Sequence, residues 1–326
     1  MASTITLEGR PPTLFKPTNL NRKQTKLITL EEHAVTPFPI PGPSSTFSLF
    51  NASFLSGLQD RLGNLALRLQ IMDANNIGAQ IISLNQPTAQ AFTNLQDSIQ
   101  FCQQANRYIF ETYCTPHPDR FFGFATLPTQ DGHAAAVELE RCVTEYGFVG
   151  AMVNGFTATD DPDQGLYLDD PQFDALWEVA QRMQKPIFIH PRVPLESNMR
   201  VLKDMPALHG APYGFARETV EHVLRLMYSG VFDRFPSLKG PKKKLFQQYF
   251  QDNIVCNTSG MPRTSALINL LAETKVENVM FSVDYPYESI AEMREWFETV
   301  PVADETWKDI GYRNAIALFK LPLDYD

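Results

Sequence analysis

LITLEEH, residues 27–33, decides the fold: it is an apolar β-strand that ends in side chains able to bind a metal. Side chains of a strand alternate between its two faces, so Glu31 and His33 project the same way while Glu32 points to the other face. A carboxylate beside an imidazole at the carboxyl end of a strand is how a (β/α)8 barrel begins a metal site. Taken alone, the stretch also fits a strand that ends in solvated charge.

Two further strand ends favour the metal site. The apolar run 186–189 is stopped by His190, and the run 279–283 is stopped by Asp284; a proline follows within two residues in both cases. Together with Glu31 and His33 they make two imidazoles and two carboxylates. This set suits one divalent ion, Zn(II) or Mn(II), with an open coordination position for water or substrate.

Length and composition indicate a globular enzyme of one barrel domain. The chain has 326 residues, of which 44% are hydrophobic and 20% charged. That length accommodates a (β/α)8 barrel with insertions, so we expect a single domain over 27–326. Residues 1–26 are polar and contain prolines without the apolar core of a secretory signal, which predicts a flexible N-terminal extension.

Net charge and cysteine usage limit the classes of binding partner and the cellular compartment that we expect. The formal net charge of -9 argues against nucleic acid or an anionic membrane as the main partner. No apolar run approaches the roughly 18 residues that a membrane-spanning helix needs. The four cysteines are scattered and form no Cys-x-x-Cys, so we interpret them as reduced thiols of a cytoplasmic protein.

Alternation of apolar β-branched runs with helical patterns predicts an α/β fold with a parallel sheet. Seven strands are expected, at 27–33, 79–84, 121–127, 148–154, 186–190, 253–260 and 279–284. The sixth of the eight barrel strands is reduced to the stub Ser237–Lys239, because Gly240-Pro241 ends it at once. The prediction is therefore a (β/α)8 barrel whose sixth strand is truncated or missing.

With these motifs placed, the chain resembles the metal-dependent hydroxybenzoate decarboxylases of the amidohydrolase superfamily. That branch includes salicylate, 2,3-dihydroxybenzoate and γ-resorcylate decarboxylases and, more distantly, aminocarboxymuconate-semialdehyde decarboxylase. The resemblance extends over about 26–320. Its ordered markers are Leu30-Glu31-Glu32-His33, His117-Pro118-Asp119-Arg120-Phe121, Phe124-Ala125-Thr126-Leu127, Tyr146-Gly147-Phe148, His190-Pro191-Arg192, Gly230-Val231-Phe232-Asp233-Arg234-Phe235-Pro236, Asn257-Thr258-Ser259-Gly260 and Ser282-Val283-Asp284-Tyr285-Pro286.

The resemblance implies roles for particular residues. Glu31, His33, His190 and Asp284 match the metal ligands, and Asp284 matches the group that protonates the ring carbon before CO2 leaves. The family's sixth strand normally ends in Gly-His-x-Gly-Glu, which this chain lacks.

Three further side chains are candidates for binding substrate. Arg192 is suited to pair with a carboxylate, although a surface ion pair explains it equally well. Asn154 and Ser259 fall near the carboxyl ends of strands, where a backbone-capping role is the alternative for each.

The leading functional hypothesis is non-oxidative decarboxylation of a small hydroxybenzoic acid of the salicylate, orsellinate or 6-methylsalicylate kind. Two alternatives stay open. The same metal site also suits a hydrolase that activates water, and a chain without the sixth-strand motif also suits a catalytically impaired homologue or partner subunit. By resemblance, we further expect a homo-oligomer, a dimer or a tetramer.

Overall fold

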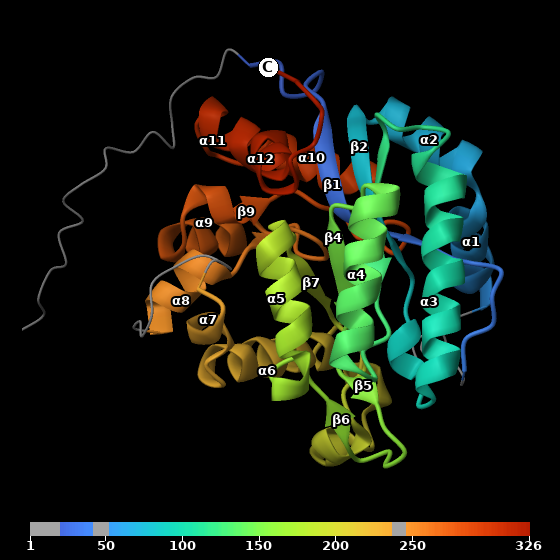
Figure 1. The fold of residues 1–326 in the computed structure, drawn as a ribbon. Coiled ribbons are helices and arrows are strands. Elements are labelled where there is room, and N and C mark those ends of the chain that lie inside the picture. Colours follow the sequence, from blue (N-terminus) through green and yellow to red (C-terminus); the bar gives the residue numbers. More distant parts are fainter. Residues whose placement is uncertain (1–19, 42–51, 237–245) are drawn as a thin grey trace, which may run out of the picture.

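An incomplete barrel of parallel strands forms the centre of the protein (Figure 1). The computed structural model describes residues 20–41, 52–236 and 246–326. Five strands form one parallel sheet in the order β1-β2-β3-β4-β7, with the bounds Leu27–Ala34, Ile77–Leu84, Phe121–Thr126, Gly150–Asn154 and Ile187–His190. A second parallel sheet pairs β8 (Cys256–Asn257) with β9 (Val279–Met280).

Hydrogen bonds attach the segment after β9 to the free edge of β1. The backbone N–H groups of Leu30 and Glu31 donate to Ser282 Oγ at 3.1 and 2.8 Å, and the N–H of His33 donates to the carbonyl of Tyr285 at 2.8 Å. The curved wall therefore runs from β8 through β9 and β1 to β7. Its two ends, β7 and β8, do not pair with each other in the part of the chain that the structure describes.

The α/β alternation predicted from the sequence is confirmed, with two corrections. The strands expected at 253–260 and 279–284 are only two residues long. Beyond Met280, the backbone N–H groups of Phe281, Ser282 and Val283 donate to a helical-turn carbonyl and to side chains instead of to the backbone of a neighbouring strand. The antiparallel hairpin of β5 (Thr157–Ala158) and β6 (Gly165–Leu166) was not expected. The predicted stub of the sixth strand, 237–239, lies outside the described residues and stays a prediction.

Helices surround the strands on the outside (Figure 1). The α-helices are α1 Ala52–Gly63, α2 Leu65–Ala74, α3 Leu95–Ile109, α4 Gly132–Tyr146, α5 Asp174–Met183, α6 Gly214–Tyr228, α7 Val231–Arg234, α8 Phe246–Asn253, α9 Thr264–Glu273, α10 Ile290–Glu298, α11 Asp304–Lys308 and α12 Asn314–Phe319. Single π-helical turns, Phe110–Cys114 and Asp309–Arg313, extend α3 and join α11 to α12. Within the described ranges, no helix has both the length and the apolar character needed to cross a bilayer.

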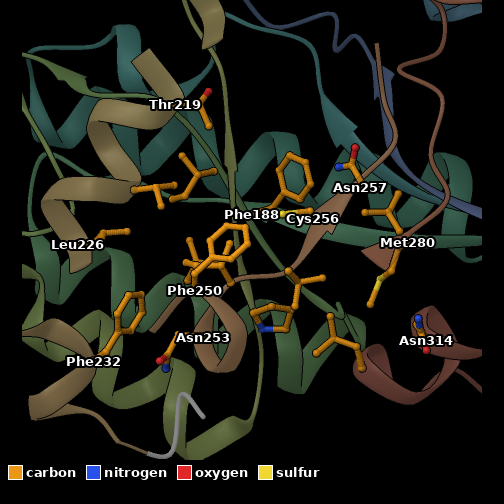
Figure 2. A pocket seen from close by; sticks show the side chains of 18 of the residues that line it. Phe188, Thr219, Leu226, Phe232, Phe250, Asn253, Cys256, Asn257, Met280 and Asn314 are labelled. Atoms are coloured by element: carbon orange, nitrogen blue, oxygen red, sulfur yellow. The ribbon is translucent and has the colours of Figure 1, made fainter. Parts of the chain in front are cut away.

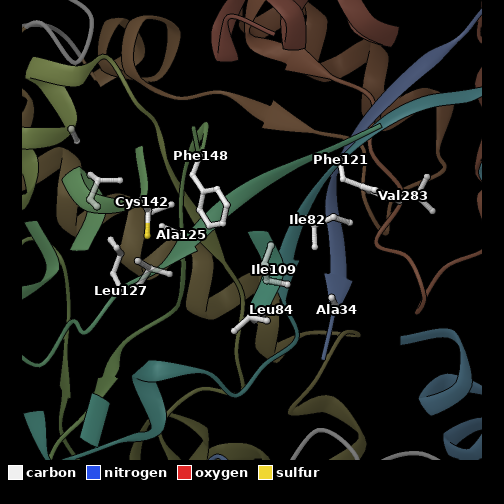
Figure 3. Close-up of a cluster of buried hydrophobic side chains, with 14 of the residues drawn as sticks. Ala34, Ile82, Leu84, Ile109, Phe121, Ala125, Leu127, Cys142, Phe148 and Val283 are labelled. Atoms are coloured by element: carbon white, nitrogen blue, oxygen red, sulfur yellow. The ribbon is translucent and has the colours of Figure 1, made fainter. Parts of the chain in front are cut away.

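Alternation along the strands divides the apolar side chains into two clusters. In β2, Ile82 packs into the large cluster between strands and helices, while Ile81 belongs to a smaller cluster inside the barrel. Figure 3 shows part of the outer cluster, where Ile82, Phe121 and Ile109 lie close together. Phe319 of α12 belongs to the inner cluster, so the last helix closes one end of the barrel.

Candidate metal centre

Four predicted ligands meet at the carboxyl ends of the strands. Glu31 and His33 lie in the last half of β1, His190 is the last residue of β7, and Asp284 follows β9. One ligand atom of each lies within 4.8 Å of those of the other three. The structure therefore brings together the set that the sequence predicted, from three separate strands.

The geometry leaves room for a central ion. His33 Nε2 lies 3.1 Å from Asp284 Oδ1, and His190 Nε2 lies 3.5 Å from Glu31 Oε1. The two imidazole rings meet edge to face, with centroids 4.7 Å apart. His33 Nε2 and Asp284 Oδ1 are buried but neither has a hydrogen-bond partner. Two such atoms, close but not aligned with each other, are what a shared cation would satisfy, so the residues fit the implied metal.

Burial gives the two imidazoles, but not the two carboxyl groups, the protonation state that metal binding requires. It lowers the pKa of His33 to about 4 and that of His190 well below its ordinary value, so both imidazoles keep lone pairs at neutral pH. Burial, assisted by the charge of Asp284, raises the pKa of Glu31 to about 7. Burial also raises the pKa of Asp284 well above its ordinary value. Two acids held together in this way are ionised most readily beside a cation.

Access to the site is from the side of Asp284. The side chain of Asp284 is 26% exposed, whereas those of Glu31, His33 and His190 are buried. The backbone of Asp284 has φ of +81°, a conformation that is costly for a residue with a Cβ and that concentrates at functional sites.

A surrounding layer of hydrogen bonds orients the ligands. Ser83 Oγ lies 3.3 Å from His33 Nδ1, and Asn257 Nδ2 donates to Glu31 Oε2 at 3.0 Å. Partners of this kind hold the rings and carboxylates of metal sites in position. Sequence reasoning missed both residues. Ser83 was signalled only by its place on β2, next to β1, and Asn257 by its place on the short strand β8 and in the marker stretch 257–260.

Glu32, on the other face of β1, is fully buried rather than solvated. Its carboxyl group accepts hydrogen bonds from Gln80 Nε2 at 3.1 Å and, at longer range, from Ser282 Oγ and the N–H of Val283. The buried guanidinium of Arg68 donates to Gln80 Oε1 at 3.2 Å and so places a positive charge behind the site. These contacts brace β1 beneath the ligands.

The three candidate substrate-binding residues differ in whether their polar atoms already have hydrogen-bond partners in the protein. Arg192 Nη1 donates to the carbonyl of Phe156 at 2.6 Å, and its guanidinium lies 3.8 Å from the centroid of the Phe156 ring. Asn154 Nδ2 donates to Thr88 Oγ1 at 2.8 Å, while its Oδ1 has no partner. Ser259 Oγ is likewise buried without a partner. Two polar atoms are thus free for a ligand, and Arg192 is engaged with the protein.

Comparison with known proteins places this arrangement in a family. Residues 62–239, more than half of the chain, match the model of the amidohydrolase family. The chain is 38% identical over 327 aligned positions to γ-resorcylate decarboxylase of Rhodococcus jostii strain RHA1, an alignment that covers 90% of this chain and 98% of the relative.

Solved structures agree with that relationship. A 2,6-dihydroxybenzoate decarboxylase in complex with 2,6-dihydroxybenzoate superposes with a TM-score of 0.85 at 35% identity, covering 91% of this chain and 100% of the other. A dihydroxybenzoic acid decarboxylase of Polaromonas sp. JS666, with bound manganese and the inhibitor 2-nitroresorcinol, gives a TM-score of 0.86 at 34% identity and covers 92% and 98%. The chain belongs to the amidohydrolase family, in its branch of carboxy-lyases that act on hydroxybenzoic acids.

Proposed function

We propose that the protein is a metal-dependent, non-oxidative decarboxylase of a small 2-hydroxybenzoic acid of the salicylate, orsellinate or 6-methylsalicylate kind. The observation that carries the proposal is the meeting of Glu31, His33, His190 and Asp284 within 4.8 Å of one another. The decarboxylase activities of the relatives support the same reaction class.

One divalent ion, Mn(II) or Zn(II), is the proposed cofactor. Two neutral imidazoles and two carboxylates suit either metal, and the manganese bound in the Polaromonas enzyme supports the first. Glu31, His33, His190 and Asp284 would hold the ion, which would supply Lewis-acid stabilisation of negative charge on the substrate.

Asp284 is the proposed proton donor. Its carboxyl group belongs to the ligand cluster and is the partly exposed member of that cluster, which places it where substrate enters. The proton would pass from Asp284 to the ring carbon that bears the carboxylate. The bond between that carbon and the carboxylate then breaks, CO2 leaves, and its electron pair restores the aromatic ring. The net reaction consumes one proton and needs no oxidant.

The remaining residues would hold the ring in place. Ser259 Oγ and Asn154 Oδ1 lack partners in the protein and are therefore able to bind hydroxyl groups of the substrate. Arg192, stacked on Phe156, would form one rigid wall of the site.

The test measures CO2 release from salicylate, 2,6-dihydroxybenzoate, orsellinate and 6-methylsalicylate by metal-loaded protein. We expect turnover of at least one acid, and its abolition by Asp284→Asn with the fold retained. Asp60→Asn, an equivalent change at an exposed position on α1, serves as the control and should leave turnover unchanged.

Three outcomes would contradict the proposal. Comparable CO2 release by Asp284→Asn removes Asp284 from the proton-donor role. Hydrolysis of phenolic esters or amides without CO2 release favours the hydrolase. Folded protein that binds neither Mn(II) nor Zn(II) favours the inactive homologue or partner subunit.

A further inference from the structure

A large cavity separates β7 from β8, at the break in the barrel wall. Its volume is about 1450 Å3, above the roughly 300–1000 Å3 of ordinary ligand pockets. Side chains of β7 line it, among them Ile187, Phe188 and Ile189. These three residues are only half-buried, whereas every residue of β1, β2 and β4 is buried, because no strand covers the outer edge of β7 within the described chain.

The walls of the cavity are mainly apolar and come from both layers of the fold. Leu30, Phe124 and Met280 belong to the cluster inside the barrel, while Leu226 of α6 and Phe250 of α8 come from the helical layer. Figure 2 shows Phe188 and Phe250 near the middle, Met280 on one side and Leu226 on the other. The cavity therefore connects the barrel interior with the space beneath the helices. Charged lining residues such as Glu273, Glu277 and Lys320 are exposed and stand at the outer mouth.

The inner end of the cavity reaches one ligand of the metal centre. Glu31 forms part of the lining, together with Asn257, which donates to Glu31, and Ser259, whose Oγ has no partner. A ligand in this space would meet polar atoms at one end and hydrocarbon along the rest. That pattern matches an amphiphile whose head is a hydroxylated aromatic acid.

We propose that the preferred substrate is a 2-hydroxybenzoic acid that carries a long alkyl chain on its ring, with the carboxylate at the metal centre and the chain between β7 and β8. This inference rests on the proposed function and specifies its substrate class. A compact dihydroxybenzoate leaves most of the 1450 Å3 unfilled, whereas a chain would cover the half-exposed face of β7. The reaction is unchanged: the ring carbon gains a proton, loses CO2 and yields the alkylphenol.

The first test is a chain-length series of 2,4-dihydroxy-6-alkylbenzoates from methyl to nonyl. Each methylene that enters an apolar site contributes about a fourfold gain in affinity. We expect kcat/KM to rise by at least tenfold from methyl to nonyl, mainly through a lower KM. Equal kcat/KM across the series, with the methyl acid turned over, would overturn the inference and leave the proposed function intact.

The second test needs no turnover. Binding of the matching 5-alkylresorcinols, measured by calorimetry, should tighten with chain length in the same way. Chain-dependent binding without CO2 release from any acid would contradict the proposed function while supporting the apolar site. Binding that is independent of chain length would overturn the inference. That result is expected if a second copy of the chain or another protein, rather than an alkyl chain, fills the cavity.

A matched pair of variants tests whether the dependence of kcat/KM on chain length arises in the cavity. Val223→Trp places an indole in the cavity from α6, and Val137→Trp makes the same change at an exposed position of α4 that does not line it. We expect Val223→Trp to bring the nonyl-to-methyl ratio of kcat/KM close to one and Val137→Trp to leave that ratio unchanged. Circular dichroism and thermal unfolding confirm that both fold. Should Val223→Trp not fold, the chain-length series alone decides the question.

Discussion

Arg68 donates a hydrogen bond to the backbone carbonyl of His33, so that a guanidinium from helix α2 holds a metal-site strand from behind. The guanidinium is fully buried and also lies 4.6 Å from the centroid of the Tyr285 ring, next to Asp284 in the chain. One side chain thus contacts the backbone of the ligand His33 and the ring of Tyr285, the residue that follows the ligand Asp284. The rigidity of the centre depends on a residue that touches no substrate.

Replacing Arg68 by methionine should destabilise the fold by about 3 kcal/mol, because it leaves the buried His33 carbonyl and Gln80 Oε1 without a donor and removes a positive charge near the buried carboxyl group of Glu32. Urea unfolding followed by circular dichroism measures the change. Glu32→Gln in the same background should recover part of the loss, since the uncompensated acid is then gone. A loss below about 0.5 kcal/mol for Arg68→Met would show that these contacts of Arg68 do not stabilise the fold.

Metal addition should raise the thermal unfolding temperature, because an ion that binds only the folded state stabilises it. At 100 times its dissociation constant the gain is about 2.7 kcal/mol. Differential scanning fluorimetry with Mn(II) or Zn(II), before and after EDTA, measures the shift. His190→Ala should remove most of the shift, whereas His133→Ala, at an exposed position of α4, should retain it. An unchanged shift in His190→Ala would exclude His190 as a ligand.

Because of the backbone conformation of Asp284, two variants that both lack the carboxylate should differ in their free energy of unfolding. With φ of +81°, alanine is strained at this position and glycine is not. Asp284→Gly should therefore be more stable than Asp284→Ala by about 1 kcal/mol, even though glycine loses more chain entropy on folding. Both should lose CO2 release. Equal or reversed stabilities, measured by urea unfolding, would mean that the conformation carries no strain.

The free energy of unfolding should depend on pH through Glu218, a residue that is not one of the metal ligands. This residue of α6 is fully buried and accepts a hydrogen bond from Tyr167 Oη at 3.1 Å. Burial raises its pKa to about 7 from an ordinary value of 4.5. The folded state therefore binds this proton more tightly than the unfolded state, and the associated stability, complete below pH 4.5, is lost as the pH rises towards 7.

Glu218→Gln keeps the acceptor but cannot ionise, so its unfolding free energy should fall less steeply between pH 5 and 7. The slopes should differ by up to about 1.4 kcal/mol per pH unit. Urea titrations at pH 5, 6, 7 and 8 measure them, with Glu178→Gln at an exposed position of α5 as the control. Parallel curves for the wild type and Glu218→Gln would refute the assignment.

The strands and the metal ligands could be predicted because they depend on short sequence patterns. Glu31, His33, His190 and Asp284 each follow an apolar run, and parallel strands bring such carboxyl ends to one rim whatever their separation in sequence. The ligand cluster could therefore be predicted from the sequence. The strands of the continuous sheet were also located to within about two residues.

Side-chain contacts across elements were not predictable in the same way. Arg68 looks like a solvated position of an amphipathic helix, and Glu32 looks like the polar side of a strand end. Both are buried in the folded protein, where Gln80 connects them by accepting a hydrogen bond from Arg68 and donating one to Glu32. No local sequence pattern predicts this contact, because Glu32 and Arg68 are 36 positions apart in the chain (68 − 32).

What the sequence by itself determined is the α/β architecture and the four ligands, since both arise from periodicity and from the fixed direction of parallel strands. The tertiary structure alone decided which polar groups orient those ligands and where the cavity between β7 and β8 opens. The cavity is bounded by elements from β1 to α12. Its volume is the space that these side chains leave between them, which is set only when the whole chain has packed.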